Sequence, residues 1–446
     1  MTSLERYMNS QEYGVHWPEI LLNKAISAGA QAVEIYQSSS LEKPIIFEGN
    51  RLKQAETTQA EGVALRLWRD GRPGLAVGYG PIEPHVLVEK ALAISVLNEP
   101  ETPRLATGGQ KDFGSVGAPM SVETLAEKGR EAIDLIRDRF PEAICEASLS
   151  CDVEQVRLLT STGLDYRSKD TTLNGSISAE VVDGEDLLSV GDGDTNRGSL
   201  DMVRVADSII KRLSWAQKTV KPLSGQVPVI FTAGAANILW ETLMAALNGK
   251  RVLEGTSPWA ERWGNRVISE AITLYQDPAV GPYSCPFDDE GLLTQQMTFV
   301  EKGVLKRWFS DLAVGQASKD RKGFGLGSSG NGVRPGLGSY PTPGLINLLV
   351  GPGDLSFEQL IAQHSEAIVV DQVMGEGGDI TGDISINLEL GYRVSHGKIV
   401  GRVKDTMVSG NAYVALENAI ALGNDLEWSG STCTPSIAVN GLSVTG

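Results

Sequence analysis

Asp288, Asp289 and Glu290 form a run of three carboxylates in the segment PFDDEGLLTQQ, directly before Gly291. Carboxylates this close repel one another, so that one of them can have a raised pKa, or the group can hold a cation. A solvated acidic turn between two strands is the simpler interpretation of the same residues. From the residues alone, both interpretations stay open.

A second candidate is a single acid, Glu241, in the segment AANILWETLMAALNG. This segment predicts an amphipathic helix, because its apolar residues recur at helical spacing: Ala236, Leu239, Trp240, Leu243 and Leu247. Glu241 falls toward the other side of that helix. Taken alone, it is best explained as a solvated side chain on a packed helix.

Other chemical motifs in the sequence are incomplete. The segment GFGLGSSGNG has the glycine spacing of a dinucleotide site, but its continuation, NGVRPGLGSYPTPG, cannot start the helix that such a site needs. The segment DGDTNRGSLDMV has the acid spacing of a calcium loop, yet Arg197 stands where glycine is needed, so we expect a polar turn before a helix. The four histidines form no metal-binding pair, and the four cysteines show no CxxC spacing.

The overall composition limits the partners. The chain has 446 residues and a formal net charge of −17, which disfavours an extended nucleic-acid footprint and binding to anionic membranes. No apolar run has the length that a membrane span needs, and the first residues lack the basic and apolar parts of a signal peptide. We therefore expect a cytoplasmic protein with reduced cysteines.

Local patterns predict several elements. Alternating apolar residues between Val63 and Tyr79, with Asp70-Gly71 between them, predict a β-hairpin. A second hairpin is predicted with His396-Gly397 at its turn, and Ser356 with Gln359 matches the capping box of a helix.

These elements predict a multidomain α+β protein. We expect N-terminal and middle α/β sandwich-like units, residues 1–105 and 115–220, followed by a β-rich, Gly-rich C-terminal domain, residues 225–446. The Pro- and Gly-bearing stretch 100–119 is interpreted as a linker.

Taken in order, several segments resemble the TldD/PmbA family, whose members are also described as modulators of DNA gyrase. The resemblance covers essentially the whole chain. It is carried by the segments EGVALRLWRDGRPGLA, TSTGLDYRSKDTT, SPWAERWGNRVISEAITLYQDP, FDDEGLLTQ, VEKGVLKRWFSD, SSGNGVRP, TGDISINLELGYRVSHGKI and PSIAVNGLSVTG.

The resemblance implies a metalloprotease of two related subunits. In the catalytic subunit a helix carries His-Glu-x-x-x-His, and a cysteine near the C-terminus completes a zinc site. Here Trp240 and Ala245 stand where the histidines belong, so that Glu241 is the remnant of a general base. Cys433 lies later than the family's ligand cysteine is expected. We therefore expect no metal in this chain and zinc in its partner.

The chain is most similar to the PmbA (TldE) type of subunit. This similarity implies a heterodimer with a TldD-like homologue, or a homodimer when that partner is absent, acting on unfolded or leader peptides. By resemblance, Asn331 and Arg334 join Asp288, Asp289 and Glu290 as candidate substrate-binding residues. Two alternatives remain: an independent metal-dependent hydrolase that uses this acidic run, and a gyrase-modulating binding protein.

Overall fold

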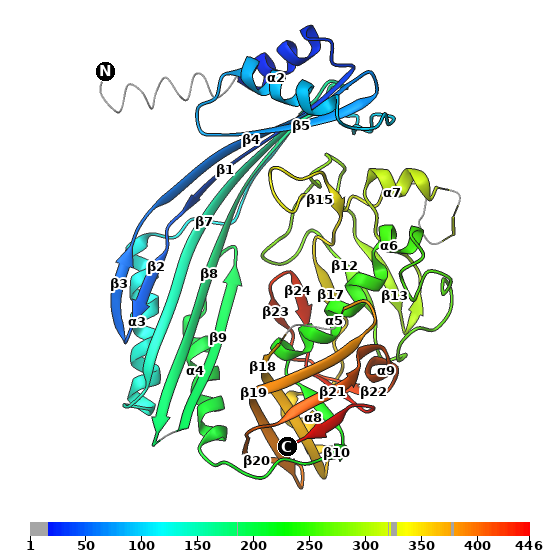
Figure 1. The fold of residues 1–446 in the computed structure, drawn as a ribbon. Coiled ribbons are helices and arrows are strands. Elements are labelled where there is room, and N and C mark those ends of the chain that lie inside the picture. Colours follow the sequence, from blue (N-terminus) through cyan, green and yellow to red (C-terminus); the bar gives the residue numbers. More distant parts are fainter. Residues whose placement is uncertain (1–16, 185, 320, 323–327, 376–378) are drawn as a thin grey trace.

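The computed structural model describes residues 17–184, 186–319, 321–322, 328–375 and 379–446. Within them the protein is a mixed α+β structure, as predicted. A long, curved sheet forms one side of the molecule, and the C-terminal domain lies along its concave side (Figure 1).

The long sheet has nine strands in the order β3-β2-β7-β1-β4-β5, and β8 extends it by pairing with β7, β6 and β9. Its strands are β1 (Ala32–Glu42), β2 (Ile45–Glu48), β3 (Arg51–Ala55), β4 (Thr58–Arg69), β5 (Arg72–Tyr79), β6 (Gln110–Val116), β7 (Ile144–Thr160), β8 (Asp165–Asp183) and β9 (Asp186–Asn196).

The first predicted hairpin is confirmed. Strands β4 and β5 pair antiparallel, with Val63 opposite Gly78. At their turn, Asp70 and Gly71 have φ angles of 54° and 72°. Two successive positive φ angles match the twist of paired strands, which explains why an Asp-Gly pair stands here.

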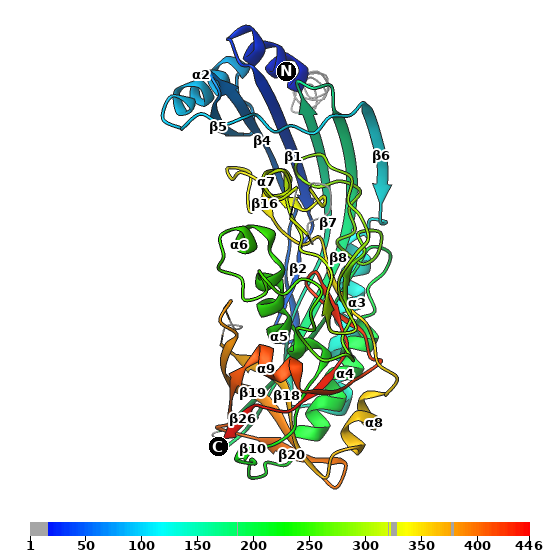
Figure 2. The same cartoon turned by 90° about the vertical axis from the view of Figure 1, so that its right-hand side faces the viewer.

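The two expected units 1–105 and 115–220 share this sheet, because β1 pairs with both β4 and β7. The interpretation of 100–119 as a linker is wrong in part, since β6 lies within it and pairs parallel with β8. Figure 2 shows β6 running beside the long strands. Strand β6 is almost fully exposed, so its sequence carries little apolar alternation that would reveal it.

Helices cover one face of the long sheet at two levels. A helix over residues 17–27 and α2 (Pro84–Ser95) pack at one end, and α3 (Val122–Arg139) and α4 (Met202–Ala216) pack at the other. The side chain of Ser121 caps α3 by accepting from the Thr124 amide, and Asp201 caps α4 by accepting from the Arg204 amide.

In its described residues, the C-terminal domain holds two larger sheets and one strand pair, β15 (Gly332–Val333) with β16 (Thr342–Pro343). The nine-stranded sheet contains β10 (Gly225–Gln226), β11 (Val229–Phe231), β18 (Glu366–Met374), β19 (Asp383–Ser395), β20 (Lys398–Val403), β21 (Met407–Asn411), β22 (Ala419–Leu422), β25 (Ile437–Val439) and β26 (Ser443–Thr445). The six-stranded sheet contains β12 (Leu274–Gln276), β13 (Met297–Glu301), β14 (Val304–Leu305), β17 (Leu348–Val350), β23 (Glu427–Ser429) and β24 (Thr432–Thr434).

Helix α5 (Ala233–Leu247) joins the two sheets of this domain. The largest apolar core combines α5 with residues of β11 and β18 from one sheet, and of β12, β13 and β17 from the other. The remaining helices are short: α6 (Gly249–Leu253), α7 (Leu312–Ala317), α8 (Phe357–Ala362) and α9 (Ala412–Glu417). The capping box of α8 is present as predicted.

Two other segments with incomplete motifs are the acidic segment near Asp192 and the glycine-rich segment near Gly325. Asp192, Asp194 and Asn196 belong to strand β9, so the expected polar turn before a helix is wrong for them. Gly325 and Gly327 lie outside the described residues. Among the described helices, none combines the length and apolar character needed to span a membrane.

Candidate functional site

Helix α5 begins where strand β11 ends. The side chain of Thr232 accepts a hydrogen bond from the Ala235 amide and so caps the helix. Strand β11 is buried within the sheet, and the cap follows it directly, so the start of α5 is fixed beside the core. The helix therefore holds a defined orientation between the two sheets.

Trp240 points into that core. Its side chain is fully buried, and its indole Nε1 donates a hydrogen bond of 2.6 Å to Oγ1 of Thr434 in β24. An indole N–H is a donor only, and it has no lone pair for a metal. Trp240 therefore packs in the core at this position of α5.

Glu241, the next residue of α5, is exposed. Its Oε1 accepts a hydrogen bond of 3.0 Å from Nδ2 of Asn237, one turn earlier. Partial burial raises the pKa of Glu241. Ala245 is half-buried and has no donor atom in its side chain.

Cys433 lies in β24, the strand that packs against α5. The fold thus brings Cys433 and Trp240 into neighbouring elements, although they are far apart in sequence. The thiol is buried, and burial raises its pKa to about 11, so that it stays protonated at neutral pH.

The acidic turn is buried rather than solvated. Asp288 is 2% exposed, and both its carboxylate oxygens accept backbone hydrogen bonds. Its Oδ1 accepts from the amides of Glu290 and Leu292 at 3.0 and 2.9 Å, and its Oδ2 accepts from the Gly332 amide at 2.8 Å. Burial raises the pKa of Asp288 to about 7, against the effect of these backbone donors.

Asp289 joins the C-terminal domain to the long sheet. Its Oδ1 accepts from the Tyr36 hydroxyl at 2.9 Å, and its Oδ2 accepts from the Arg334 amide at 2.7 Å. Glu290 accepts from the Leu312 amide at 2.7 Å. Burial, together with the charge of Asp288, raises the pKa of Glu290 to about 8.

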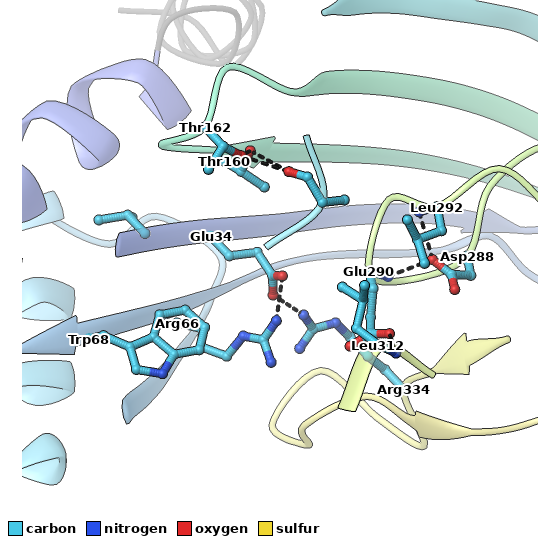
Figure 3. A network of polar contacts seen from close by, with 12 residues as sticks. Glu34, Arg66, Trp68, Thr160, Thr162, Asp288, Glu290, Leu292, Leu312 and Arg334 are labelled. Atoms are coloured by element: carbon cyan, nitrogen blue, oxygen red, sulfur yellow. Dashed lines mark hydrogen bonds and ion pairs between the residues drawn. The ribbon is translucent and has the colours of Figure 1, made fainter. Parts of the chain in front are cut away.

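Beside this turn, Glu34 of β1 receives two guanidinium groups, as Figure 3 shows. Arg66 of β4 donates to Glu34 at 2.6 Å, and Arg334 donates to its other oxygen. The side chain of Glu34 is 1% exposed, and Arg66 also stacks on Trp68. We call Glu34, Arg66, Arg334, Asp289 and Tyr36 the sheet–domain joint.

Glu34 and Arg66 were missed by the sequence analysis. A signal was available, since each is a charged residue inside an apolar strand and the two lie directly opposite in the register of β1 and β4. Arg334, a predicted substrate residue, belongs to this joint. Asn331 is fully buried and donates to Gln276 and to the Gly344 carbonyl.

A hollow of about 550 Å³ separates the long sheet from the C-terminal domain near the start of α5. One wall is formed by β7, β8 and β9, and the other by Gly234 of α5 and residues 425–429, which include β23. Strands β9 and β23 are both edge strands of their sheets. An edge strand offers unpaired main-chain groups to a ligand.

Two family models match this chain. The PmbA/TldA metallopeptidase C-terminal domain matches residues 224–446, and PmbA/TldA metallopeptidase domain 1 matches residues 33–95. The chain belongs to the PmbA/TldD family. The resemblance predicted from the sequence motifs is thereby confirmed.

Relatives of similar sequence agree with this assignment. A metalloprotease of Methanothermobacter thermautotrophicus is 25% identical over 418 residues, which cover 88% of each chain. Metalloprotease PmbA of Escherichia coli O157:H7 is 27% identical over 54% of this chain and 53% of its own.

Two solved structures show the same fold. TldE from Thermococcus kodakarensis has a TM-score of 0.86 at 23% identity, over 96% of this chain and 99% of that one. A Thermotoga maritima protein provisionally assigned as a modulator of a DNA gyrase has a TM-score of 0.85 at the same identity and coverage.

A PmbA/TldD metallopeptidase needs a metal, and the α5 residues of this chain do not fit one. Trp240 is buried in the core and bonded to Thr434, Ala245 supplies no donor atom, and Glu241 is exposed and bonded to Asn237. Within the described parts of the chain, no three His, Cys, Asp or Glu side chains are grouped to hold a metal ion. No hydrolytic step can therefore be derived from these residues.

Proposed function

We propose that this chain is the non-catalytic, PmbA (TldE)-type subunit of a cytoplasmic metalloprotease complex. Its partner is a TldD-like homologue that carries His-Glu-x-x-x-His and zinc, and the substrates are unfolded or leader peptides. The single observation that carries the proposal is the buried Trp240, bonded to Thr434 on the helix where the family's metal ligands belong. A water without a metal beside it keeps a high pKa, so Glu241 alone is a poor activator of it.

The hollow beside α5 supports a role in holding peptide. Along β9, the carbonyls of Gly191 and Gly193 already accept from Arg212 and Arg204, and the Gly191 amide donates to Gln372. A peptide that adds to an edge strand would therefore pair with β23 on the other wall.

An independent metal-dependent hydrolase has less support. Both oxygens of Asp288 are occupied by backbone amides, and Asp289 is bonded to Tyr36 and Arg334. A metal ion at this turn would have to displace these bonds. Gyrase modulation rests on the descriptions of solved structures alone, such as that of the Thermotoga maritima protein.

Reconstitution tests the proposal. The purified chain is assayed for zinc by elemental analysis and for cleavage of an unstructured peptide, first alone and then with the His-Glu-x-x-x-His homologue. We expect no stoichiometric zinc and no cleavage by the chain alone, and cleavage in the mixture. As a matched control, the homologue with its motif glutamate changed to glutamine should leave the mixture inactive.

Zinc bound to this chain together with cleavage by it alone would refute the non-catalytic assignment. Equal cleavage by the homologue with and without this chain would refute the subunit role.

A further inference from the structure

Trp263 stands out among the tryptophans of the C-terminal domain because its side chain is 44% exposed. Trp240, Trp259 and Trp308, in contrast, are at most 3% exposed, and Trp428 is half-buried. An exposed indole offers a large apolar surface with a polar N–H, which is the kind of side chain that partner proteins contact.

The ring is held in place. Its Nε1 donates to the Lys306 carbonyl at 3.0 Å, and the backbone around it is paired with β14. The Gly264 amide donates to the Leu305 carbonyl at 2.9 Å, and the Leu305 amide donates to the Asn265 carbonyl at 3.0 Å. A side chain fixed in this way loses little conformational entropy when a partner binds.

One cationic side chain lies near the ring, and the segments around it carry further cations. The Lys322 ammonium lies 5.8 Å from the ring centroid, and Arg262 donates to the Arg266 carbonyl within the same loop. We define the Trp263 patch as Trp263 with Arg262, Arg266, Lys306, Arg321 and Lys322.

Three of these cations pair with acids at the surface: Arg266 with Glu270, Lys306 with Glu301, and Arg321 with Glu261. Each of these distances is 3.0 Å, and each pair is open to solvent. Exposed pairs of this kind contribute little to stability, so a partner's carboxylates can replace them at small cost. The patch carries five cations against three acids, whereas the whole chain has a net charge of −17.

We propose that the Trp263 patch is a docking surface for an acidic segment of a partner polypeptide. Fixed tryptophan and arginine side chains are the residues that dominate protein–protein interfaces. Charge complementarity then selects acidic partners. Nucleic acid fits less well, because the strongly acidic remainder of the chain repels an extended phosphate backbone.

The surface is separate from the candidate site. The neighbouring elements β13 and α7 lie on the side of the C-terminal domain that faces away from the lower part of the long sheet (Figure 1). The inference therefore does not depend on the proposed proteolytic role.

Fluorescence anisotropy with a short labelled oligoglutamate peptide at low salt tests the proposal on the full chain. We expect binding that weakens as salt is added, and a loss of about tenfold or more in affinity for W263A. The surface charge variant R262E/K322E should abolish binding without altering the fold. The matched controls Y79A and K398E, which change an exposed aromatic and an exposed cation elsewhere, should bind like the wild type.

Three results would overturn the proposal. The first is no binding of oligoglutamate by the wild type, or equal losses in the controls. The second is tighter binding of a labelled oligothymidine of equal charge, which would assign the patch to nucleic acid. The third is self-association in sedimentation velocity that W263A removes, which would assign the patch to a second copy of the chain.

Discussion

Glu34 balances the charge of the sheet–domain joint, and replacing it with glutamine tests whether that joint stabilises the fold. The carboxylate is 1% exposed and accepts hydrogen bonds from both Arg66 and Arg334. Glutamine has nearly the same shape but no charge. In E34Q, two guanidinium groups lose the carboxylate they share.

The expected loss of unfolding free energy in E34Q follows from the burial of Glu34. Removing one partner of a buried ion pair typically costs about 3–5 kcal/mol, because a charge is left uncompensated away from water. The side-chain oxygen of the introduced glutamine can still accept one hydrogen bond, but its amide group faces the other guanidinium with a donor. We therefore expect E34Q to lower the free energy of unfolding by about 3 kcal/mol.

Urea unfolding followed by circular dichroism measures this change. The matched control is E48Q, which removes the exposed partner of Lys53 and should leave the unfolding midpoint nearly unchanged. In the double variant E34Q/R334Q, the two losses should not add, since both changes act on one interaction. If E34Q unfolds at the same urea concentration as E48Q, the joint contributes no net stability and the reasoning fails.

Three further predictions concern the buried turn and α5. The pKa values of Asp288 and Glu290 are raised to about 7 and about 8, from about 4 in an unfolded chain. Between these values the folded state binds more protons, so the free energy of unfolding should fall as pH rises from about 4 to about 8. Urea unfolding at a series of pH values should show a shallower fall in E290Q. W240A should cost about 3–5 kcal/mol in the same assay, because it empties a fully buried site. G332A should lower the melting temperature, since a Cβ there would lie 2.4 Å from Oε2 of Glu290, whereas G336A, with no atom within 4 Å, should not.

Elements with strong local signals were predictable from the sequence. The β4–β5 hairpin follows from alternation and an Asp-Gly turn, and the β19–β20 hairpin follows from His396-Gly397, whose φ angles are 51° and 74°. Helix α5 follows from the spacing of its apolar residues. In each case the residues that determine the element are neighbours in the chain.

The sheet–domain joint was not predictable in the same way. Tyr36 and Asp289 are 253 positions apart, and Glu34 and Arg334 are 300 apart. No local period links residues so distant, and an acidic run such as 288–290 is typical of exposed turns. The Tyr36–Asp289 and Glu34–Arg334 contacts form only where the long sheet meets the domain.

The acidic turn shows why residue type alone does not identify a reactive site in this chain. Three adjacent acids suggest a reactive centre, yet all four carboxylate oxygens of Asp288 and Asp289 accept hydrogen bonds. The amide donors hold the turn within the domain, and the Tyr36 hydroxyl links it to the sheet. A group that must keep these bonds for stability cannot also exchange them with a substrate without loosening the joint. The turn is therefore better suited to fixing the walls of the hollow than to reacting within it, and chemistry in a complex of this chain would depend on side chains that another subunit brings.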